Sequence, residues 1–418
     1  MDVSNKQYIE HLCRKAKESS RVLANYSTVQ KNNLLRKIAE SLRKKADYII
    51  SENRKDLAAA KEESLSGAMV DRLLLSEERI ASMAASVLEI ALMEDPVSRI
   101  EKMTTRPSGI RVGQMRVPLG VVAVIYESRP NVTVDIAALC IKSGNAAILR
   151  GGREAIHSNR ALHAVIRDAM VELSVPESCV TFIDRTDREL VPILVTMNTY
   201  IDIVVLRGGE SLIKTVTAES TIPVIKHDKG VCHIFVDESA DEDMANRIAV
   251  NAKVQRPGVC NAMETLLIHK NYRHKESLLQ SLLDQHVEIR GCEKTAAIFP
   301  GRVKPAGEED WGFEFLDLIL AVKIVDSIQS AIEHIARYSS NHSEAIVTSD
   351  YLNAERFLKE VDSSAVFVNA STRFHDGGEF GLGAEVGIST QKLHARGAMG
   401  MEGLTTLKYV VYGKGEVR

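Results

Sequence analysis

The fold of this chain is most strongly constrained by an alternation of short apolar runs with helix-like segments, which begins at Gly120. The first apolar run covers residues 121–126, and a helical pattern over 131–143 follows it and ends at Gly144. Short apolar strands separated by helices are typical of parallel sheets that carry helices on both faces. The chain therefore predicts an α/β fold with a doubly wound parallel sheet.

The same alternation continues along the chain in two series. Further strands of the first series are expected at 146–149, 180–183, 203–206 and 223–225. Strands of the second series are expected at 233–236, 264–269, 345–348 and 365–369. Helices are expected where apolar residues recur at helical spacing, at 5–23, 29–46, 47–61, 158–173 and 241–254. Two series of strands predict two α/β domains.

Two segments outside these series have an extended character. Residues 107–118 alternate apolar and other side chains, and 404–412 form a last apolar strand. We expect a first domain at 1–106 and 119–226, a second domain at 227–395, and an arm at 107–118 and 396–418. Such an arm can add strands to the sheet of a neighbouring copy, so a homo-oligomer is expected.

Composition argues against several classes of protein. The chain is 45% hydrophobic and 26% charged, with a formal net charge of −3, so it has no basic excess for nucleic acid or a membrane surface. It has no apolar run of about 18 residues, and its polar N-terminus does not resemble a secretory signal. The six cysteines are scattered without CxxC pairs, which argues against zinc and disulfides and favours a cytoplasmic location.

Residues 254–263, VQRPGVCNAM, place Cys260 between a predicted helix and a predicted strand. Pro257 and Gly258 break the helix just before the thiol. A cysteine in such a loop can face a cleft, where its thiolate can attack an acyl group and hold it as a thioester. The alternative is a buried structural thiol, since free cysteines are mostly core residues.

Four segments together resemble the aldehyde dehydrogenase superfamily and, within it, the branch of gamma-glutamyl phosphate reductases. They are residues 118–133, 142–152, 254–262 and 378–389. The resemblance covers nearly the whole chain. It implies a Rossmann-type cofactor domain at 1–106 and 119–226, a second α/β catalytic domain at 227–395, and an extended oligomerisation arm.

The resemblance also implies an activity. It is the NADPH-dependent reduction of L-glutamyl 5-phosphate to L-glutamate 5-semialdehyde and phosphate, in proline biosynthesis, by an acyl-phosphate reductase that holds its substrate as a thioester on Cys260. No metal is implied. The upstream glutamate 5-kinase is a candidate partner.

Arginines stand at two cofactor positions of the superfamily. Arg150 takes the place of a lysine that contacts the adenosine ribose, and Arg153 takes the place of a glutamate common in NAD-using relatives. Beside the Gly151-Gly152 turn, two guanidinium groups suit a 2′-phosphate, which favours NADPH over NADH. The alternative is a pair of solvated arginines. The G-x-G-x-x-G fingerprint is absent after a strand, and the superfamily does not depend on it.

Other cofactor contacts are implied further along the chain. Gly208 and Gly209 match a second glycine turn, which opens a helix beneath the pyrophosphate. Alone, such a pair can be only a turn. Glu314 matches the glutamate that binds the nicotinamide ribose in relatives, although a lone glutamate is more often a surface residue.

One departure from the superfamily concerns water. Hydrolytic relatives carry a glutamate that activates water, and residues 221–230 contain none. Its absence fits a reductase, because water would destroy the thioester before hydride arrives. His227 or Asp228 could serve as the base instead, and the chain would then be a hydrolytic NAD(P)-dependent aldehyde dehydrogenase. A non-catalytic binding protein of the same fold is disfavoured by Cys260 and both glycine turns.

The groups that stabilise the oxyanion and bind the substrate are open to alternatives. Asn131, Ser128 and the backbone N–H of Cys260 are all candidates for the oxyanion donor, and Asn131 is placed with Cys260 in catalysis. Arg129 and Ser128 are both expected to bind the substrate. Arg129 would bind its phosphate or carboxylate, with a structural salt bridge as the alternative. His375 is expected in the loop that grips the glutamyl amino and carboxylate groups.

Overall fold

The computed structural model describes residues 3–226 and 229–418, and the chain divides into two compact units. Unit 1 is Met1–Lys226, Gly381–Gly387 and Met399–Arg418, and unit 2 is His227–Phe380 and Ile388–Ala398. The expected domains differ from this division in two places, because 381–387 lie with unit 1 and 396–398 lie with unit 2. Backbone hydrogen bonds explain the first difference, since Met399 exchanges them with Val386 and Gly387.

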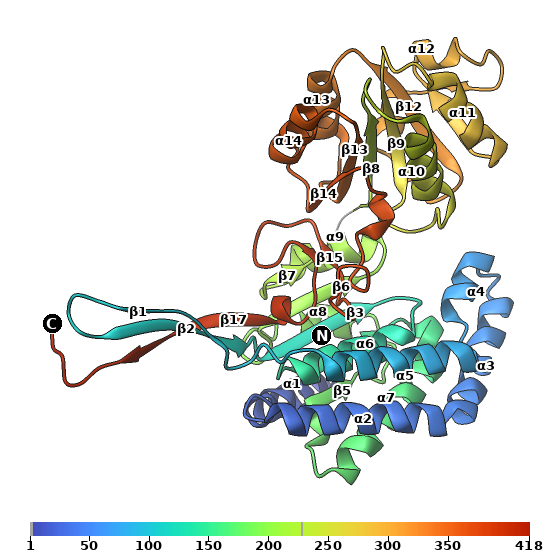
Figure 1. Ribbon diagram of the computed structural model, residues 1–418. Helices are drawn as coiled ribbons and strands as arrows, with labels where there is room; N and C mark the ends of the chain where they lie inside the picture. Colours follow the sequence, from blue (N-terminus) through green and yellow to red (C-terminus); the bar gives the residue numbers. More distant parts are fainter. Residues whose placement is uncertain (1–2, 227–228) are drawn as a thin grey trace. The chain divides into compact units, whose positions relative to one another are not determined.

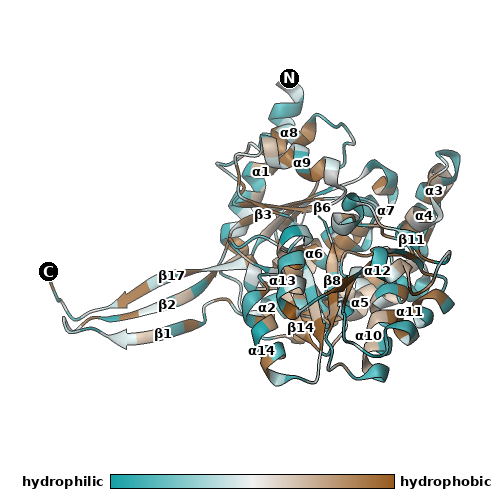
Figure 2. Ribbon diagram, turned by 90° about the horizontal axis from the view of Figure 1, so that it is seen from above, coloured by the Kyte–Doolittle hydropathy of each residue, from teal (hydrophilic) through white to brown (hydrophobic). Residues whose placement is uncertain are grey.

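Unit 1 is built on a five-stranded parallel sheet in the order β5-β4-β3-β6-β7. Its strands are β3 (Val121–Tyr126), β4 (Ala146–Gly151), β5 (Val180–Phe182), β6 (Ile203–Arg207) and β7 (Val224–Ile225). Every residue of β3 and β4 is buried, as expected for central strands covered on both faces, and the apolar colour of β3 and β6 is visible in Figure 2. The strand order reverses between β3 and β6, which is where such sheets bind ligands.

Helices cover the unit 1 sheet (Figure 1). They are α1 (Val3–Leu23), α2 (Thr28–Lys44), α3 (Ala46–Glu62), α4 (Gly67–Leu73), α5 (Glu77–Leu92), α6 (Asn131–Lys142), α7 (Ile156–Glu172), α8 (Leu190–Leu194) and α9 (Glu210–Glu219), with 3₁₀ turns η1 (Arg153–Ala155), η2 (Glu177–Cys179) and η5 (Glu402–Leu404). Apolar residues of α1, α8 and α9 share one core with β3, β4 and β6. Local signals set the helix starts: at α2, Ser27 accepts the Gln30 N–H while the Gln30 side chain accepts the Ser27 N–H.

A three-stranded antiparallel arm projects from the body of unit 1 (Figure 1). Its strands, in spatial order, are β1 (Ile100–Thr105), β2 (Arg111–Pro118) and β17 (Thr405–Tyr412). The sequence predicted β2 and β17 but not β1. The pattern of β1 is broken by a register shift between Glu101 and Thr104, with Lys102 at a φ of 53°.

Unit 2 holds a seven-stranded parallel sheet in the order β11-β10-β12-β9-β8-β13-β14. Its strands are β8 (Cys232–Val236), β9 (Met263–His269), β10 (Glu288–Gly291), β11 (Lys304–Pro305), β12 (Ile319–Val325), β13 (Ser343–Val347) and β14 (Ala365–Val368), with a separate pair β15 (Ile388–Ser389) and β16 (Gly397–Ala398). The two parallel sheets confirm the predicted α/β fold class. Strands β10, β11 and β12 were not among those predicted.

The helices of unit 2 cover both faces of its sheet. They are α10 (Glu242–Val254), α11 (Lys275–Asp284), α12 (Glu293–Ala296), α13 (Ile328–Tyr338) and α14 (Tyr351–Glu360), with 3₁₀ turns η3 (Glu308–Gly312) and η4 (Thr372–Phe374). Successive side chains of β8 point to opposite faces, so Ile234 and Val236 pack with α10 and α11 while Phe235 packs with α13 and α14. Within the described part of the chain, no helix has the length and apolarity needed to cross a bilayer.

Candidate active site

Residues 255–262, which carry the predicted nucleophile Cys260 and are called the nucleophile loop below, join α10 to β9 in unit 2. Strands β12, β9, β8 and β13 are parallel neighbours, so the segments that precede them meet at one edge of the sheet. Cys260 is a free thiol and half-buried on this edge. This exposure distinguishes it from Cys13, Cys140 and Cys232, whose thiols are buried and whose pKa values are raised by burial.

Gly230, which precedes β8, packs directly on the backbone of Cys260. A Cβ placed on Gly230 would lie 2.0 Å from the Cys260 carbonyl oxygen and 2.4 Å from its Cα, so only glycine permits this approach. The Gly230 N–H donates to Glu314 Oε1 at 2.9 Å, and the Cys232 thiol lies 3.1 Å from the Cys260 carbonyl oxygen. The backbone of Cys260 is therefore enclosed by the segment at the start of β8.

A buried ion pair joins the two ends of the nucleophile loop. Lys253, in the last turn of α10, donates to Glu264 of β9 at 2.6 Å, and neither side chain has exposed surface. Glu264 also accepts the Leu316 N–H at 3.2 Å. Burial raises the pKa of Glu264 to about 7 and lowers the pKa of Lys253, while the contact between the two charges opposes both shifts. The pair connects the loop to the turn that carries Glu314.

A third contact ties the loop to the segment after β14. The side-chain amide of Asn261 donates to the carbonyl oxygens of His375 at 3.0 Å and Arg373 at 3.3 Å. Thr372 Oγ1 donates to the Asn261 carbonyl oxygen at 2.8 Å, and Arg373 Nε donates to Gln255 Oε1 at 3.0 Å. Sequence reasoning missed Arg373, although a basic residue two positions before the predicted His375 was a signal for it.

The His375 side chain lies inside unit 2. Its ring has no exposed surface, Nδ1 lies 2.8 Å from Ser343 Oγ, and Nε2 has no hydrogen-bond partner among the residues that the structure describes. Burial lowers the pKa of His375 to about 4, so the ring is neutral at physiological pH. In this conformation the ring cannot touch a substrate, because it has no accessible surface, and it supports the segment that carries Arg373 from within.

Unit 1 contains a cavity of about 780 Å³ at the carboxyl ends of β3 and β4. Three of the residues predicted to bind the cofactor, Arg150, Gly152 and Arg153, line it. Its other lining residues are Ile125, Tyr126, Glu127, Glu154, Thr186, Arg188, Glu189, Val191, Pro192, Ser211, Leu212, Thr215 and Val216. The cavity thus lies beside the reversal of strand order, where doubly wound sheets bind ligands.

The arginines of the cavity differ in their surroundings. Arg150 is buried and donates to the carbonyl oxygens of Gly151 and Thr186, but its Nε has no partner in the described structure. Arg153 is exposed and pairs with Glu63 at 3.2 Å. Arg188 is also exposed and lines the same cavity. Sequence reasoning missed Arg188, because it follows a short strand in a polar run without a distinctive motif.

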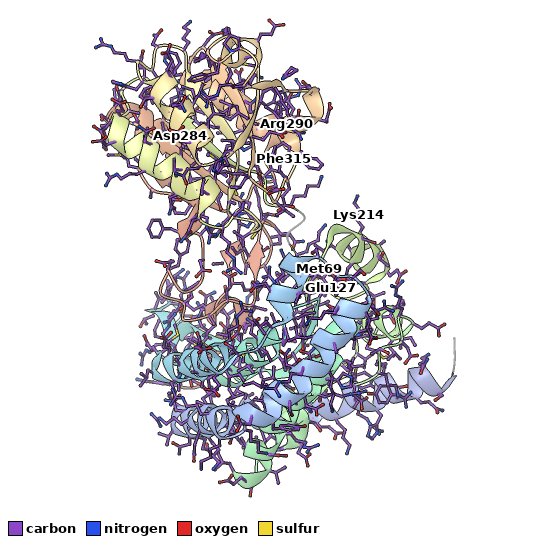
Figure 3. The ribbon with its side chains drawn as sticks, turned by 90° about the vertical axis from the view of Figure 1, so that its right-hand side faces the viewer. Met69, Glu127, Lys214, Asp284, Arg290 and Phe315 are labelled. Atoms are coloured by element: carbon purple, nitrogen blue, oxygen red, sulfur yellow. The ribbon has the colours of Figure 1, made fainter. Side chains whose placement is uncertain are left out.

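The second glycine turn is closed by an acidic side chain. Gly209 is the N-cap of α9, and its N–H donates to Glu127 Oε2 at 2.8 Å. A Cβ on Gly208 would lie 2.7 Å from both Glu127 Oε2 and Leu212 Cδ2. Glu127, which Figure 3 labels together with Lys214 of α9, was missed by sequence reasoning, although an acidic residue directly after β3 was a signal. Its carboxylate accepts the N–H predicted to bind the pyrophosphate.

The predicted oxyanion and substrate residues 128–131 lie in unit 1. Ser128 is buried with a φ of 48°, and both its N–H and its hydroxyl bond to Glu154 Oε1, at 2.5 and 3.0 Å. Arg129 is half-buried. Asn131 begins α6, is exposed, and donates to Asp135 at 2.9 Å.

The two residues named as alternative bases, His227 and Asp228, lie outside the residues that the structure describes. Among residues 3–226 and 229–418, no group of three or more histidine, cysteine, aspartate or glutamate side chains is arranged to hold a metal ion.

The chain is similar to proteins of known family over its full length. The family model described as "Aldehyde dehydrogenase family" matches residues 1–293. The gamma-glutamyl phosphate reductase of Caldanaerobacter subterraneus subsp. tengcongensis is 55% identical over 98% of this chain and 99% of its own length. That of Moorella thermoacetica is 53% identical over 97% of each chain.

A solved structure extends this likeness to the fold. The crystal structure of gamma-glutamyl phosphate reductase from Thermotoga maritima has a TM-score of 0.95 and 46% identity, and the match covers 98% of this chain and 99% of that one. Full-length identity of this size, together with the agreement of fold, confirms the resemblance seen in the four sequence segments. The chain belongs to the aldehyde dehydrogenase family and, within it, to the gamma-glutamyl phosphate reductases.

Proposed function

We propose that this chain reduces L-glutamyl 5-phosphate to L-glutamate 5-semialdehyde and phosphate through a thioester on Cys260, with NADPH as the reductant, as a step of proline biosynthesis. The observation that carries the proposal is the half-buried thiol of Cys260 on a loop braced at both ends. It stands in a chain that is 55% identical over 412 residues to a gamma-glutamyl phosphate reductase.

The thiolate of Cys260 begins the reaction by attacking the acyl carbonyl carbon. A C–S bond forms, the C–O bond to the phosphate breaks, and the phosphate leaves with the electron pair. NADPH supplies, when bound, the hydride that reduces the thioester to a thiohemiacetal on Cys260. Collapse of this anionic adduct re-forms the C=O bond, breaks the C–S bond, releases the aldehyde and restores the Cys260 thiolate.

The unit 1 cavity fits the proposed cofactor. Its volume of about 780 Å³ is in the range of small-molecule sites, and the unpartnered Nε of Arg150 is a buried donor that a ligand would satisfy. We assign the 2′-phosphate end of NADPH to Arg150, Arg153 and Arg188, next to the turn at Gly151 and Gly152. These guanidinium groups would neutralise the phosphate through charge-assisted hydrogen bonds.

The pyrophosphate is assigned to the turn at Gly208 and Gly209 at the start of α9. For this contact the Gly209 N–H must exchange the Glu127 carboxylate for a phosphate oxygen. Glu314 stays the proposed ligand of the nicotinamide ribose, and its contact with Gly230 makes it a neighbour of the Cys260 backbone.

Proposals for the oxyanion donor and for His375 follow from their surroundings. Asn131, Ser128 and the backbone N–H of Cys260 stay the candidates for the oxyanion donor, and the positive φ of Ser128 is the kind of strain found at functional sites. We propose that His375 acts indirectly, by holding the segment that anchors Asn261.

The arm of β1, β2 and β17 supports an assembly of identical copies. β17 is an edge strand, and its residues Leu407, Tyr409, Val411 and Tyr412 are exposed. An apolar edge strand is a template for pairing with another chain. We propose a homo-oligomer that forms through this arm, and Tyr409→Lys should shift the enzyme to smaller species in size-exclusion chromatography. A complex with glutamate 5-kinase and a cytoplasmic location stay predictions.

The catalytic proposal is tested by replacing Cys260. Cys260→Ala should abolish NADPH-dependent reduction while NADPH still binds with unchanged affinity, and Cys260→Ser should be very slow, because a neutral hydroxyl is a poor nucleophile. Incubation of the wild type with glutamate 5-semialdehyde and NADP⁺ without phosphate should leave a glutamyl adduct on the Cys260 peptide, detected by mass spectrometry. A variant that retains more than about a tenth of the rate, roughly 1.4 kcal/mol of barrier, would contradict the covalent role.

A further inference from the structure

Two arginines near the predicted nucleophile have no acidic partner among the residues that the structure describes. Arg256 is exposed in the nucleophile loop, and Arg373 is half-buried in the segment after β14. Neither forms an ion pair with any residue in the described part of the chain. Two other partly buried arginines do have carboxylate partners: Arg116 pairs with Glu101 at 3.2 Å, and Arg207 pairs with Glu385 at 3.4 Å.

Arg373 is held against the nucleophile loop at two points. Its Nε donates to Gln255 at the start of the loop at 3.0 Å, and its carbonyl oxygen accepts from Asn261, the residue after Cys260, at 3.3 Å. The guanidinium is thus fixed next to Arg256, which follows Gln255 in the chain. Its two terminal nitrogens donate to no residue that the structure describes, so they are available to a ligand.

The charges of this cluster influence one another. Burial lowers the pKa of Arg373, the charge of Arg256 lowers it further, and the nearby Cys260 and Asp376 act in the opposite direction. The Asp376 carboxylate is occupied by the Gly378 N–H at 2.9 Å instead of forming an ion pair with an arginine. Two like charges that are brought together without a partner cost free energy, and a bound anion removes this cost.

We propose that Arg256 and Arg373 bind the phosphate of the acyl phosphate, the group that leaves when Cys260 attacks. This assignment rests on the thioester role of Cys260 proposed above. The phosphate is bonded to the carbonyl carbon under attack, so it must lie beside the sulfur. The substrate's α-carboxylate lies at the other end of the carbon chain. Guanidinium groups bind phosphate through parallel charge-assisted hydrogen bonds, which a single lysine cannot make.

The two arginines act on both directions of the reaction. In the forward direction they stabilise the negative charge that grows on the phosphate as the C–O bond breaks and the C–S bond forms. In reverse they hold inorganic phosphate, whose oxygen attacks the thioester carbonyl carbon, so that the C–O bond forms and the Cys260 thiolate leaves. The site therefore recognises the leaving group separately from the glutamyl chain.

The reverse reaction tests this assignment with inorganic phosphate as the probe. Arg373→Gln and Arg256→Gln should each raise the KM for phosphate by at least about tenfold, the effect of losing a charge-assisted contact, while the KM for glutamate 5-semialdehyde and the Kd for NADP⁺ stay unchanged. Arg373→Lys keeps the positive charge but loses the two parallel N–H donors of the guanidinium, so it should give an intermediate KM for phosphate. Arg247→Gln, at an exposed position of α10, is the matched control and should change none of these values.

A second measurement needs no turnover. The rate at which iodoacetate alkylates Cys260, divided by the rate for neutral iodoacetamide, reports the local positive charge, and this ratio should fall several-fold in both glutamine variants and at high salt. An unchanged KM for phosphate would overturn the assignment. A raised KM for glutamate 5-semialdehyde alone would also overturn it, because Arg256 and Arg373 would then bind the α-carboxylate of the substrate. A Cys260→Ser variant that retains more than about a tenth of the wild-type rate would instead contradict the thioester role, and the arginine variants cannot produce that result.

Discussion

Replacing Gly230 with alanine tests how strictly the proposed nucleophile, Cys260, must be positioned. The added Cβ would lie 2.0 Å from the carbonyl oxygen of Cys260 and 2.4 Å from its Cα, and both are backbone atoms that cannot rotate away. An ordinary contact needs about 3.5 Å, so the loop must retreat by about 1.5 Å. Alanine keeps the N–H that Glu314 accepts, and Gly230 does not have a positive φ, so the perturbation is purely steric.

A displacement of about 1 Å at a reacting atom can cost about 100-fold in rate, so the kcat of Gly230→Ala should fall by about that factor. Overpacking should lower the free energy of unfolding by about 1–3 kcal/mol. Gly312→Ala is the control in the same unit, because its Cβ would meet Tyr338 O at an ordinary 3.6 Å. NADPH oxidation gives kcat, and thermal unfolding gives stability. A kcat within about threefold of the wild type, less than 1 kcal/mol of barrier, would refute this account of the contact.

Three further predictions concern the cofactor, the acyl acceptor and pH. Arg153→Glu should raise the KM for NADPH by at least about tenfold and leave the KM for NADH nearly unchanged. Arg167→Glu, at a position outside the cavity, is the control. An equal rise in KM for both cofactors would show that Arg153 has a structural role. Oxidation of glutamate 5-semialdehyde by NADP⁺ should require phosphate or arsenate, and brisk oxidation without either would show that water attacks the thioester. The pKa of His375 is lowered to about 4 by burial, so the unfolded chain binds its proton more tightly. The free energy of unfolding, measured with urea, should therefore be highest above about pH 6.5 and should fall by about 3 kcal/mol as the pH drops to about 4. The variant His375→Asn should show a smaller decrease.

Much of the fold could be predicted because local and long-range preferences agree in the central strands. The apolar run at 121–126 became β3, which is buried throughout, and the helical pattern at 131–143 became α6. Strands β10 and β11 could not be predicted in the same way. They are short, and Arg290 and Lys304 carry charges that mask an apolar pattern. Strand β10 pairs with β12, and β11 pairs with β10. Both pairings join segments that are separated along the chain, so a local pattern does not predict them.

The candidate site was predictable where a residue type is itself reactive. Cys260 stands out in the sequence, because a thiol after a helix-breaking Pro-Gly pair is typical of a loop that can expose a nucleophile. Arg373 and Glu127 do not stand out in the sequence, because their contacts span more than 80 residues of chain. Arg373 contacts Gln255, and Glu127 contacts Gly209. The buried ion pair of Lys253 with Glu264 could not be predicted from the sequence either.

If Cys260 carries the acyl group as proposed, its surroundings predict that this group passes to phosphate and not to water. The described carboxylates around the loop already hold protein donors: Glu264 accepts from Lys253, and Glu314 accepts from the Gly230 N–H. A carboxylate that accepts such bonds is a weaker base, because the bonds stabilise its charged form. Under the proposed phosphate role, Arg373 and its neighbour Arg256 would attract an anionic acceptor. On this proposal the surroundings of Cys260 would disfavour hydrolysis and favour phosphate, so that the thioester would persist until hydride reaches it.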